Sequence, residues 1–208
     1  MARKDVLELR RKISSADPDT LDLLLRQART HYGWQTREVP DSLLRDVYDL
    51  AKFGPTSMNQ QPARFVFVRS EAAKQKLLPA LAEANRQKML SAPVTAIIAY
   101  DLAFFDNLPK VFPPNPNARG MFAGNEAMAS ANAVRNGTLQ AAYFMIAARA
   151  YGLDVGAMSG FDAMAVDAAF FSGRSIRTNF LCNLGYGDEE KLFRRLPRLD
   201  FEEVAEIA

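Results

Sequence analysis

Residues 53–69 read FGPTSMNQQPARFVFVR, and this stretch joins the end of a helix, a polar turn and the start of a strand. Gly54 suits the position just past a helix, where the backbone turns left-handed, and Pro55 cannot continue a helix. The turn then carries three short polar side chains, those of Thr56, Ser57 and Asn59. They are suited to rim a planar heterocycle edged with carbonyls and ring nitrogens. They equally suit a turn that caps only its own backbone, so this segment alone leaves both interpretations open.

Regular elements are predicted on both sides of this corner. Residues 40–51 form the preceding helix, because a start signal is followed by apolar residues at helical spacing. Residues 64–69 alternate as a strand, Ser70 starts a helix that is divided near Pro79, and Asp162 caps a later helix. The continuous apolar run 94–100 is typical of a strand covered on both faces, and residues 175–184 form another strand. This alternation predicts one domain over residues 1–208, of the α+β class with α/β-like layers, in which helices flank a central mixed sheet.

Three further segments complete the outline. Residues 132–151 predict a long helix that is apolar nearly all round, so it must be buried on several sides. Another subunit could supply the second covering surface, or the helix could be central within one subunit. Residues 101–128 combine prolines with aromatics and predict an excursion over a site. Residues 1–16 are charged and are expected to be a flexible N-terminus, and residues 196–207 form an apolar tail.

Composition excludes several classes of function. Twenty-six basic and 24 acidic residues give a net charge of +2. The sequence contains no basic block interleaved with aromatic residues, so nucleic-acid binding is not indicated. No apolar run is long enough to cross a bilayer, so we expect a soluble, cytoplasmic protein. Cys182 is the single cysteine of the sequence, so a disulfide within the chain is impossible. His31 is the single histidine, and these two residues are too few to build a typical zinc site. Any reactive chemistry is therefore expected to come from an organic cofactor.

Two more segments carry candidate ligand-binding residues. Arg29 and Thr30 end the first helix and could hold a phosphate, although an arginine there also complements the helix dipole. Residues 156–162 are rich in small side chains and allow a flat ligand to approach the backbone, or simply form a tight turn. Arginines at 194, 195 and 198 precede the tail and suit either phosphate or solvent.

In their order along the chain, these motifs resemble the nitroreductase-like FMN flavoproteins, from about Asp17 to Glu203. The resemblance runs through residues 28–31, 54–62, 85–90, 152–160 and 194–204. It implies a nitroreductase-like fold and a domain-entwined homodimer that binds two FMN molecules at the subunit interface. Within the family, the chain is most similar to the malonic semialdehyde reductases of the Rut uracil-degradation pathway, through residues 28–31, 51–69, 159–162 and 195–199.

The resemblance also implies a set of cofactor-binding residues. At the phosphate end they are Arg29, Thr30, His31, Arg195 and Arg198. At the ring they are Asn85 on the polar edge, Ser159 and Gly160 near the reactive N5, and Pro55, Thr56, Ser57 and Asn59 from the neighbouring subunit. No catalytic side chain is implied, because the flavin N5 carries the chemistry.

The resulting hypothesis is an FMN oxidoreductase in which NADH or NADPH reduces the flavin and a small oxidised substrate reoxidises it in a ping-pong scheme. Reduction of malonic semialdehyde to 3-hydroxypropionate is the specific candidate. The alternatives are a generic NAD(P)H nitro or quinone reductase, and a flavin-binding regulator or store without turnover. The expected partners are a second copy and a small-molecule substrate, with neither nucleic acid nor membrane.

Overall fold

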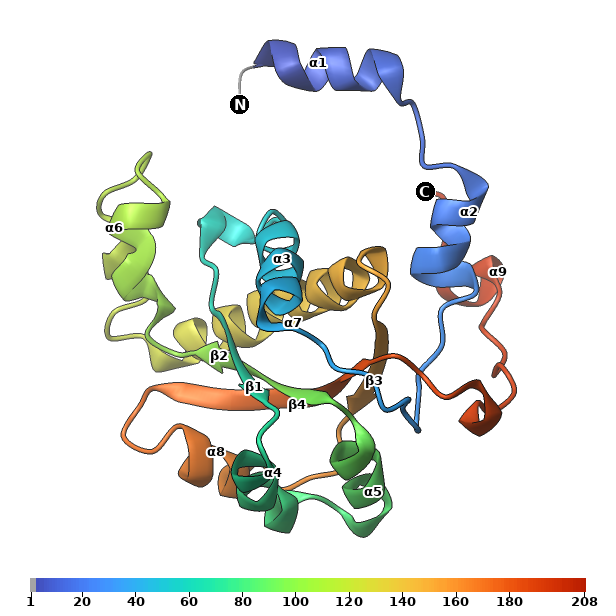
Figure 1. Ribbon diagram of the computed structural model, residues 1–208. Helices are drawn as coiled ribbons and strands as arrows, with labels where there is room; N and C mark the ends of the chain where they lie inside the picture. The colour runs from blue at the N-terminus through green and yellow to red at the C-terminus, as the bar shows by residue number, and fades with distance from the viewer. Residues whose placement is uncertain (1–2) are drawn as a thin grey trace.

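The computed structural model describes residues 3–208 and contains, within them, one four-stranded sheet with helices on both faces (Figure 1). The strands are β1 (Ala63–Val68), β2 (Val94–Asp101), β3 (Asp154–Met158) and β4 (Ile176–Gly185), and they lie in the order β1-β2-β4-β3. The α+β class and the strands predicted at 64–69, 94–100 and 175–184 are confirmed.

The strand pairing corrects one detail of the expectation. The pairs β1–β2, β2–β4 and β3–β4 are all antiparallel, and a bulge interrupts the β2–β4 pair between Ile98 and Ala99. Among the described residues the only parallel pairing is an isolated bridge between Thr30 and Val155. The four strands therefore form an antiparallel sheet and not the expected mixed one. Even β1 and β2, which are neighbours joined by a connection long enough for a parallel crossover, run in opposite directions.

Strand β2 separates two hydrophobic cores. Ala96 and Ile98 point into the core under the long helix α7, whereas Ile97 and Ala99 point into the core under α4, α5 and α8. All four side chains are at most 1% exposed. Because alternate residues of a strand face opposite sides, a run this apolar requires cover on both faces.

One face is covered by α3 (Asp41–Ala51) and α7 (Glu126–Ala150). The fully buried Phe144 of α7 packs on Phe65 and Phe67 of β1, at ring-centroid distances of 4.8 and 6.0 Å. The helix predicted at 132–151 is therefore confirmed, but it begins six residues earlier. Asn125 caps that start by accepting a hydrogen bond from the Met128 N–H.

The other face is covered by α4 (Glu71–Leu77), α5 (Glu83–Ser91) and α8 (Ala163–Phe170). Ser70 and Asp162 are the N-caps of α4 and α8, and Pro79 lies in the short turn between α4 and α5, as the sequence predicts. The caps fix where α4 and α8 begin, and the strands that precede them fix which face they cover.

Residues 101–128 form a small lobe with its own core. Three short helical segments, η4 (Phe104–Asn107), α6 (Leu108–Val111) and η5 (Ala118–Met121), enclose Phe104, Leu108 and Phe122. The side chain of Asn59 donates to the Val111 carbonyl over 2.7 Å. The predicted excursion is thus a packed lobe attached to the polar turn at 55–61.

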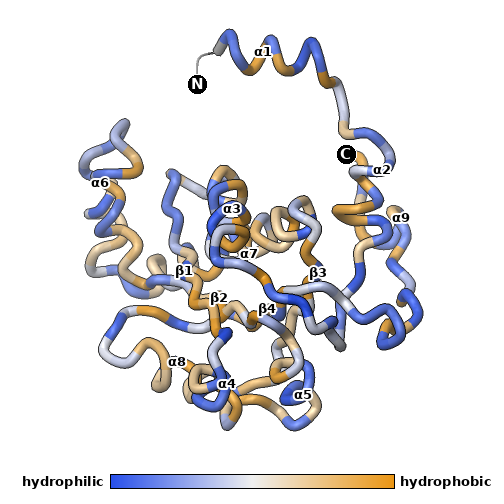
Figure 2. Tube along the Cα trace, in the orientation of Figure 1, coloured by the Kyte–Doolittle hydropathy of each residue, from blue (hydrophilic) through white to orange (hydrophobic). Residues whose placement is uncertain are grey.

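Both ends of the chain extend from the body. The helix α1 (Arg3–Lys12) stands apart, and a helical segment formed by α2 (Pro18–Leu21) and the π-helical η1 (Asp22–Arg26) follows it (Figure 1). Near the C-terminus, α9 (Phe201–Val204) lies beside α2. Apolar residues recur along α1 outside the body (Figure 2). Residues 1 and 2 of the expected flexible N-terminus lie outside the described residues. In the part of the chain that is described, no helix combines the length and apolarity that crossing a bilayer requires.

Candidate functional site

Two segments distant in sequence pair side by side next to β3. We define residues 28–35 as the first arm and residues 186–198 as the second arm. The Gln35 N–H donates to the Tyr186 carbonyl over 2.8 Å, and the Asp188 N–H donates to the Gly33 carbonyl over 3.0 Å. The arms are thus joined by backbone hydrogen bonds that do not depend on side-chain identity.

Side chains continue this pairing toward the tail. Arg29 donates to the Phe193 carbonyl, and Arg195 donates to the Ala28 carbonyl over 3.1 Å. The rings of Tyr32 and Phe193 meet edge to face at 5.0 Å. Each arm therefore holds a guanidinium of the other in place.

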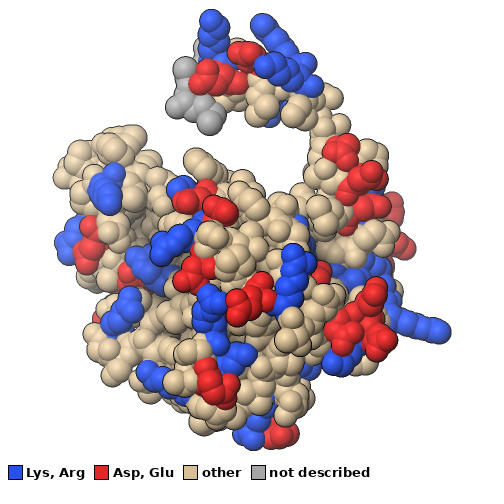
Figure 3. All heavy atoms as spheres, in the orientation of Figure 1, with Lys and Arg blue, Asp and Glu red and all other residues tan. Residues whose placement is uncertain are grey.

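An open groove of about 1040 Å³ lies between the arms, η1 and the end of α7. Six arginines line it: Arg26, Arg29, Arg149, Arg194, Arg195 and Arg198. Basic side chains gather at this corner of the surface, below α2 (Figure 3). The structure thus brings together Arg29, Thr30, Arg195 and Arg198, all of which the resemblance assigns to a phosphate end.

The charge in this groove is largely unpaired. Arg26 forms an ion pair with Asp22, but none of the other five arginines has a carboxylate partner in residues 3–208. Arg29, Arg149 and Arg195 donate to carbonyl oxygens instead. Guanidinium groups fixed in this way fit a phosphate, which accepts their parallel N–H bonds.

Arg149 is a groove residue that the sequence did not reveal. It lies in the last turn of α7, donates to the Leu24 carbonyl over 3.0 Å, and has a pKa that burial lowers. One arginine at the end of an apolar helix is the ordinary complement to the helix dipole, so no local pattern distinguishes it.

His31 lies in the wall of the site and not in the groove. The residue is 8% exposed, and its Nε2 lies 3.2 Å from Asp154 Oδ1, while the Gly187 N–H donates to Asp154 Oδ2 over 2.8 Å. The His31 N–H also donates to the Val155 carbonyl over 3.0 Å. Asp154, the first residue of β3, therefore connects both arms to that strand.

The residues assigned to a ring edge form a second cluster, on α5 and after β3. Asn85 Nδ2 donates to the Gly160 carbonyl over 3.0 Å, and Lys88 Nζ donates to Asn85 Oδ1 over 3.0 Å. Lys88 Nζ also lies 4.8 Å from the centre of the Tyr32 ring, which lines the groove. Ser159 is exposed beside Gly160. Tyr32 and Lys88 thus join the ring-edge cluster to the arginine groove.

The polar turn at 55–61 is rigid but lies elsewhere. Asn136 of α7 accepts a hydrogen bond from the Ser57 N–H over 2.8 Å, and Met58, Asn59 and Gln61 all have positive φ angles. Within one chain the turn lies across α3 from the arginine groove (Figure 1). Pro55, Thr56, Ser57 and Asn59 are therefore not brought together with the other candidate residues in a single copy.

Comparison with known proteins matches this arrangement to one family. A family model described as the Nitroreductase family matches residues 25–186. A protein of Cupriavidus pinatubonensis, named as an inferred NADH dehydrogenase/NAD(P)H nitroreductase, is 54% identical over 192 residues, which are 91% of this chain and 98% of that protein. HadB of Ralstonia pickettii carries the same description and is 55% identical over 191 residues, 91% of this chain and 97% of HadB.

Solved structures share the fold at lower identity. YdfN of Bacillus subtilis, described as a nitroreductase, superposes with a TM-score of 0.81 at 21% identity, over 92% of this chain and 100% of that one. A nitroreductase of Exiguobacterium sibiricum in complex with FMN superposes with a TM-score of 0.81 at 18% identity, over 93% of this chain and 99% of that one. At these identities the likeness establishes the fold.

Asp154 gives the site a testable pH dependence. Burial raises the pKa of its carboxyl, but hydrogen bonds from His31 and Gly187 outweigh burial, so the folded pKa lies below 3.8. A carboxyl whose pKa is lower in the folded than in the unfolded state stabilises the fold at pH values above the unfolded pKa. This stabilisation is lost as the pH falls through the folded pKa.

We expect the difference in unfolding free energy between wild type and Asp154→Asn to shrink between pH 5 and pH 3, measured by urea denaturation. Asp46→Asn, on the exposed side of α3, is the matched control, and a difference that stays constant over this range contradicts the assignment.

Proposed function

This chain belongs to the nitroreductase family, and from that membership we propose that it is an NAD(P)H oxidoreductase that holds FMN in the groove between its arms. When bound, FMN would supply hydride transfer between NADH or NADPH and a small oxidised substrate, so the two substrates would bind in turn. The observation that carries the proposal is the groove with five arginines that have no carboxylate partner among residues 3–208.

The residues present fit this cofactor. We assign its phosphate to Arg29, Thr30, Arg195 and Arg198, with Arg149 in the same groove, because these groups could donate several charge-assisted hydrogen bonds to one anion. Asn85, Ser159 and Gly160 would lie at the ring, where small and amide groups leave room for a flat heterocycle. His31 contributes by orienting the first arm through Asp154.

We assign Pro55, Thr56, Ser57 and Asn59 to the ring of a flavin held mainly by a second copy, which makes the functional unit a homodimer. Three features support this. The turn is stiff and lies away from its own groove. Exposed apolar residues on α7 include Val134 and Leu139. The C-terminal segment exposes Leu199, Phe201, Val204 and Ile207, with exposed fractions from 55 to 88%.

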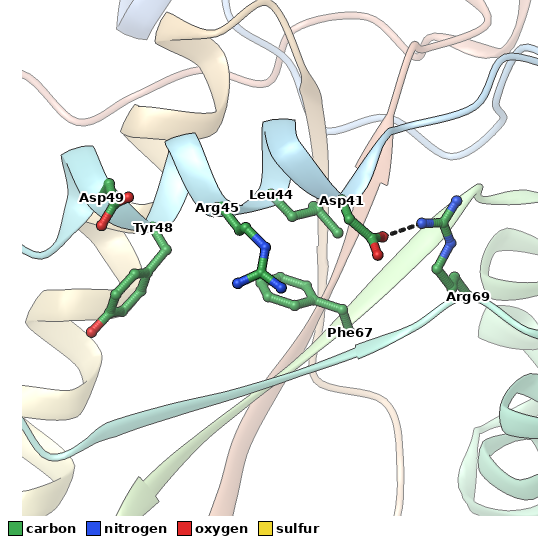
Figure 4. Close-up of a pocket in the computed structure, with 7 residues that line it drawn as sticks. All are labelled: Asp41, Leu44, Arg45, Tyr48, Asp49, Phe67 and Arg69. Atoms are coloured by element: carbon green, nitrogen blue, oxygen red, sulfur yellow. Dashed lines mark hydrogen bonds and ion pairs between the residues drawn. The ribbon is translucent and has the colours of Figure 1, made fainter.

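A surface for such a segment lies along β1, which is an edge strand. A groove of about 610 Å³ lies between β1 and α3, where Arg45 of α3 points toward Phe67 and Asp41 forms an ion pair with Arg69 (Figure 4). The lining combines Leu44, Tyr48 and Phe67 with charged groups of both signs, and an edge strand can pair with an added chain. We propose that the segment 196–207 packs on the partner.

The substrate proposal is narrower. Malonic semialdehyde, reduced to 3-hydroxypropionate, is the acceptor that the sequence resemblance suggests, and nitro compounds and quinones are the alternatives that the relatives' names suggest. A flavin-binding module without turnover remains the contrasting function. We place the protein in the cytoplasm.

The proposed turnover has a direct spectroscopic test. The purified protein reconstituted with FMN should show bound-flavin absorbance that NADH or NADPH bleaches in a stopped-flow instrument. Mixing the reduced protein with malonic semialdehyde, a quinone or a nitroaromatic should restore the colour, and the fastest acceptor identifies the substrate class. FMN binding without bleaching would favour the module, and absence of FMN uptake would refute the proposal.

The phosphate assignment predicts selective loss of FMN affinity. Arg29→Ala and Arg198→Ala should each weaken FMN binding by about 1–3 kcal/mol, because each removes a hydrogen bond to a charged group. Lys110→Ala, in the lobe at 101–128, is the matched control for loss of one exposed cation and should leave affinity unchanged. Titration of the flavin-free protein with FMN gives the measurement. Equal affinities in all three variants would mean that the phosphate lies elsewhere.

The dimer proposal predicts that truncation after Arg198, which keeps the arginines assigned to the phosphate, lowers dimer stability and flavin occupancy together. Binding and assembly are linked if each flavin needs groups from both copies. Sedimentation across a dilution series, recorded at the flavin absorbance, follows both quantities in one experiment. A monomer that keeps its full complement of flavin at high dilution would contradict the shared site.

A further inference from the structure

A fully buried polar pair lies where β2 and β4 pair. Thr95 and Asn183 are opposite each other in the register, both are 0% exposed, and the Thr95 hydroxyl donates to Asn183 Oδ1 over 2.7 Å. Their neighbours along the strands, such as Ala96 and Cys182, are apolar. Polar side chains in such surroundings cost free energy unless they are hydrogen-bonded, so the other contacts of the pair are informative.

The amide of Asn183 reaches both elements that carry the ring-edge cluster. Its Nδ2 donates to the Lys88 carbonyl of α5 over 3.1 Å and lies 3.6 Å from the sulfur of Met158, the last residue of β3. Lys88 follows Asn85 by one helical turn, and Met158 directly precedes Ser159. One buried side chain thus fixes α5 relative to the end of β3.

The ring-edge cluster has little tolerance for movement of these elements. A Cβ atom at Gly160 would lie 2.7 Å from Asn85 Nδ2, so the helix and the β3 end are already in close approach. Lys74 of α4 separately holds the C-terminal end of α5, because its Nζ donates to the Leu90 and Ala92 carbonyls over 2.9 and 2.7 Å. Loss of the Asn183 bond should therefore shift or loosen α5 at Lys88 without releasing the helix.

We propose that Thr95 and Asn183 are positioning residues for the ring-edge half of the site. Asn183 holds α5 and β3 at the separation that lets Asn85 meet Gly160, and Thr95 holds the Asn183 amide in the orientation that donates to Lys88. The effect on flavin rests on the proposed FMN-dependent function, whereas the effect on α5 does not.

The test compares Asn183→Leu, Thr95→Val and Thr95→Ser with Thr178→Val. Thr178 is the matched control because it is on β4 like Asn183, is 7% exposed, and donates a hydroxyl hydrogen bond to Asp167 over 2.7 Å. Neither Thr178 nor Asp167 belongs to either half of the site. Hydrogen exchange of residues 83–91 in the flavin-free protein reports the position of α5, and FMN titration reports the site.

Asn183→Leu and Thr95→Val should speed exchange in residues 83–91 and weaken FMN binding roughly 3- to 10-fold, the effect of losing about one net hydrogen bond. Thr95→Ser, which keeps the hydroxyl, should match wild type, and Thr178→Val should change neither quantity even if it lowers the melting temperature. Wild-type exchange and affinity in Thr95→Val, or equal losses in Thr178→Val, would overturn the proposal. If Asn183→Leu does not fold, the Thr95 pair decides. If wild type binds no FMN, the proposed function fails while hydrogen exchange still decides the positioning role.

Discussion

The constraint on which this fold depends is the burial of β2 on both faces. Its side chains alternate between two cores, so neither face can be left to solvent. The chain meets this requirement by placing α4, α5 and α8 on one side and α3 and α7 on the other. Strand β2 pairs with β1 on one side and β4 on the other, and β3 pairs with the far side of β4, so β1 and β3 are the two edges of the sheet. The location of every candidate binding surface follows from that.

The two edges are completed differently. At β3, the first arm forms a bridge from Thr30 to Val155, and Asp154 connects both arms to the strand. At β1, α3 leaves a groove with exposed charged and aromatic side chains. The arginine groove is therefore built from one chain, whereas the β1 edge is the surface that we propose for a second copy. An edge strand with unpaired backbone groups is a template for such pairing.

Local patterns predicted most elements because their signals are local. Periodicity identified three of the four strands, and Ser70 and Asp162 marked helix starts. Residues 154–158, DVGAM, were missed as a strand because they are few, small and include a glycine. The antiparallel pairing was missed because register is a non-local property. For the site, the order of the motifs identified Arg29 and Arg195 as one end, but nothing in the sequence shows that Arg149 joins them or that the His31 side chain turns toward Asp154.

The long helix α7 has a second role that its apolar character concealed. Around its middle, Asn132, Asn136 and Gln140 recur every four residues and so share one face. Their side chains bond to Gln60, Ser57 and the Ala63 N–H, which holds the polar turn from end to end. Three residues of that turn have positive φ, a conformation that costs about 1–3 kcal/mol each away from glycine.

Such a conformation persists only where its surroundings over-determine it, and the buried amides of α7 supply that determination. Asn136 is 1% exposed and bonds to both Gln60 and Ser57, so the turn cannot relax without leaving those groups unpaired. The same helix packs Phe144 into the core in its second half. The stability of the core is thereby used to hold a strained polar turn in one conformation, and a turn fixed in advance loses little further entropy when it contacts a ligand.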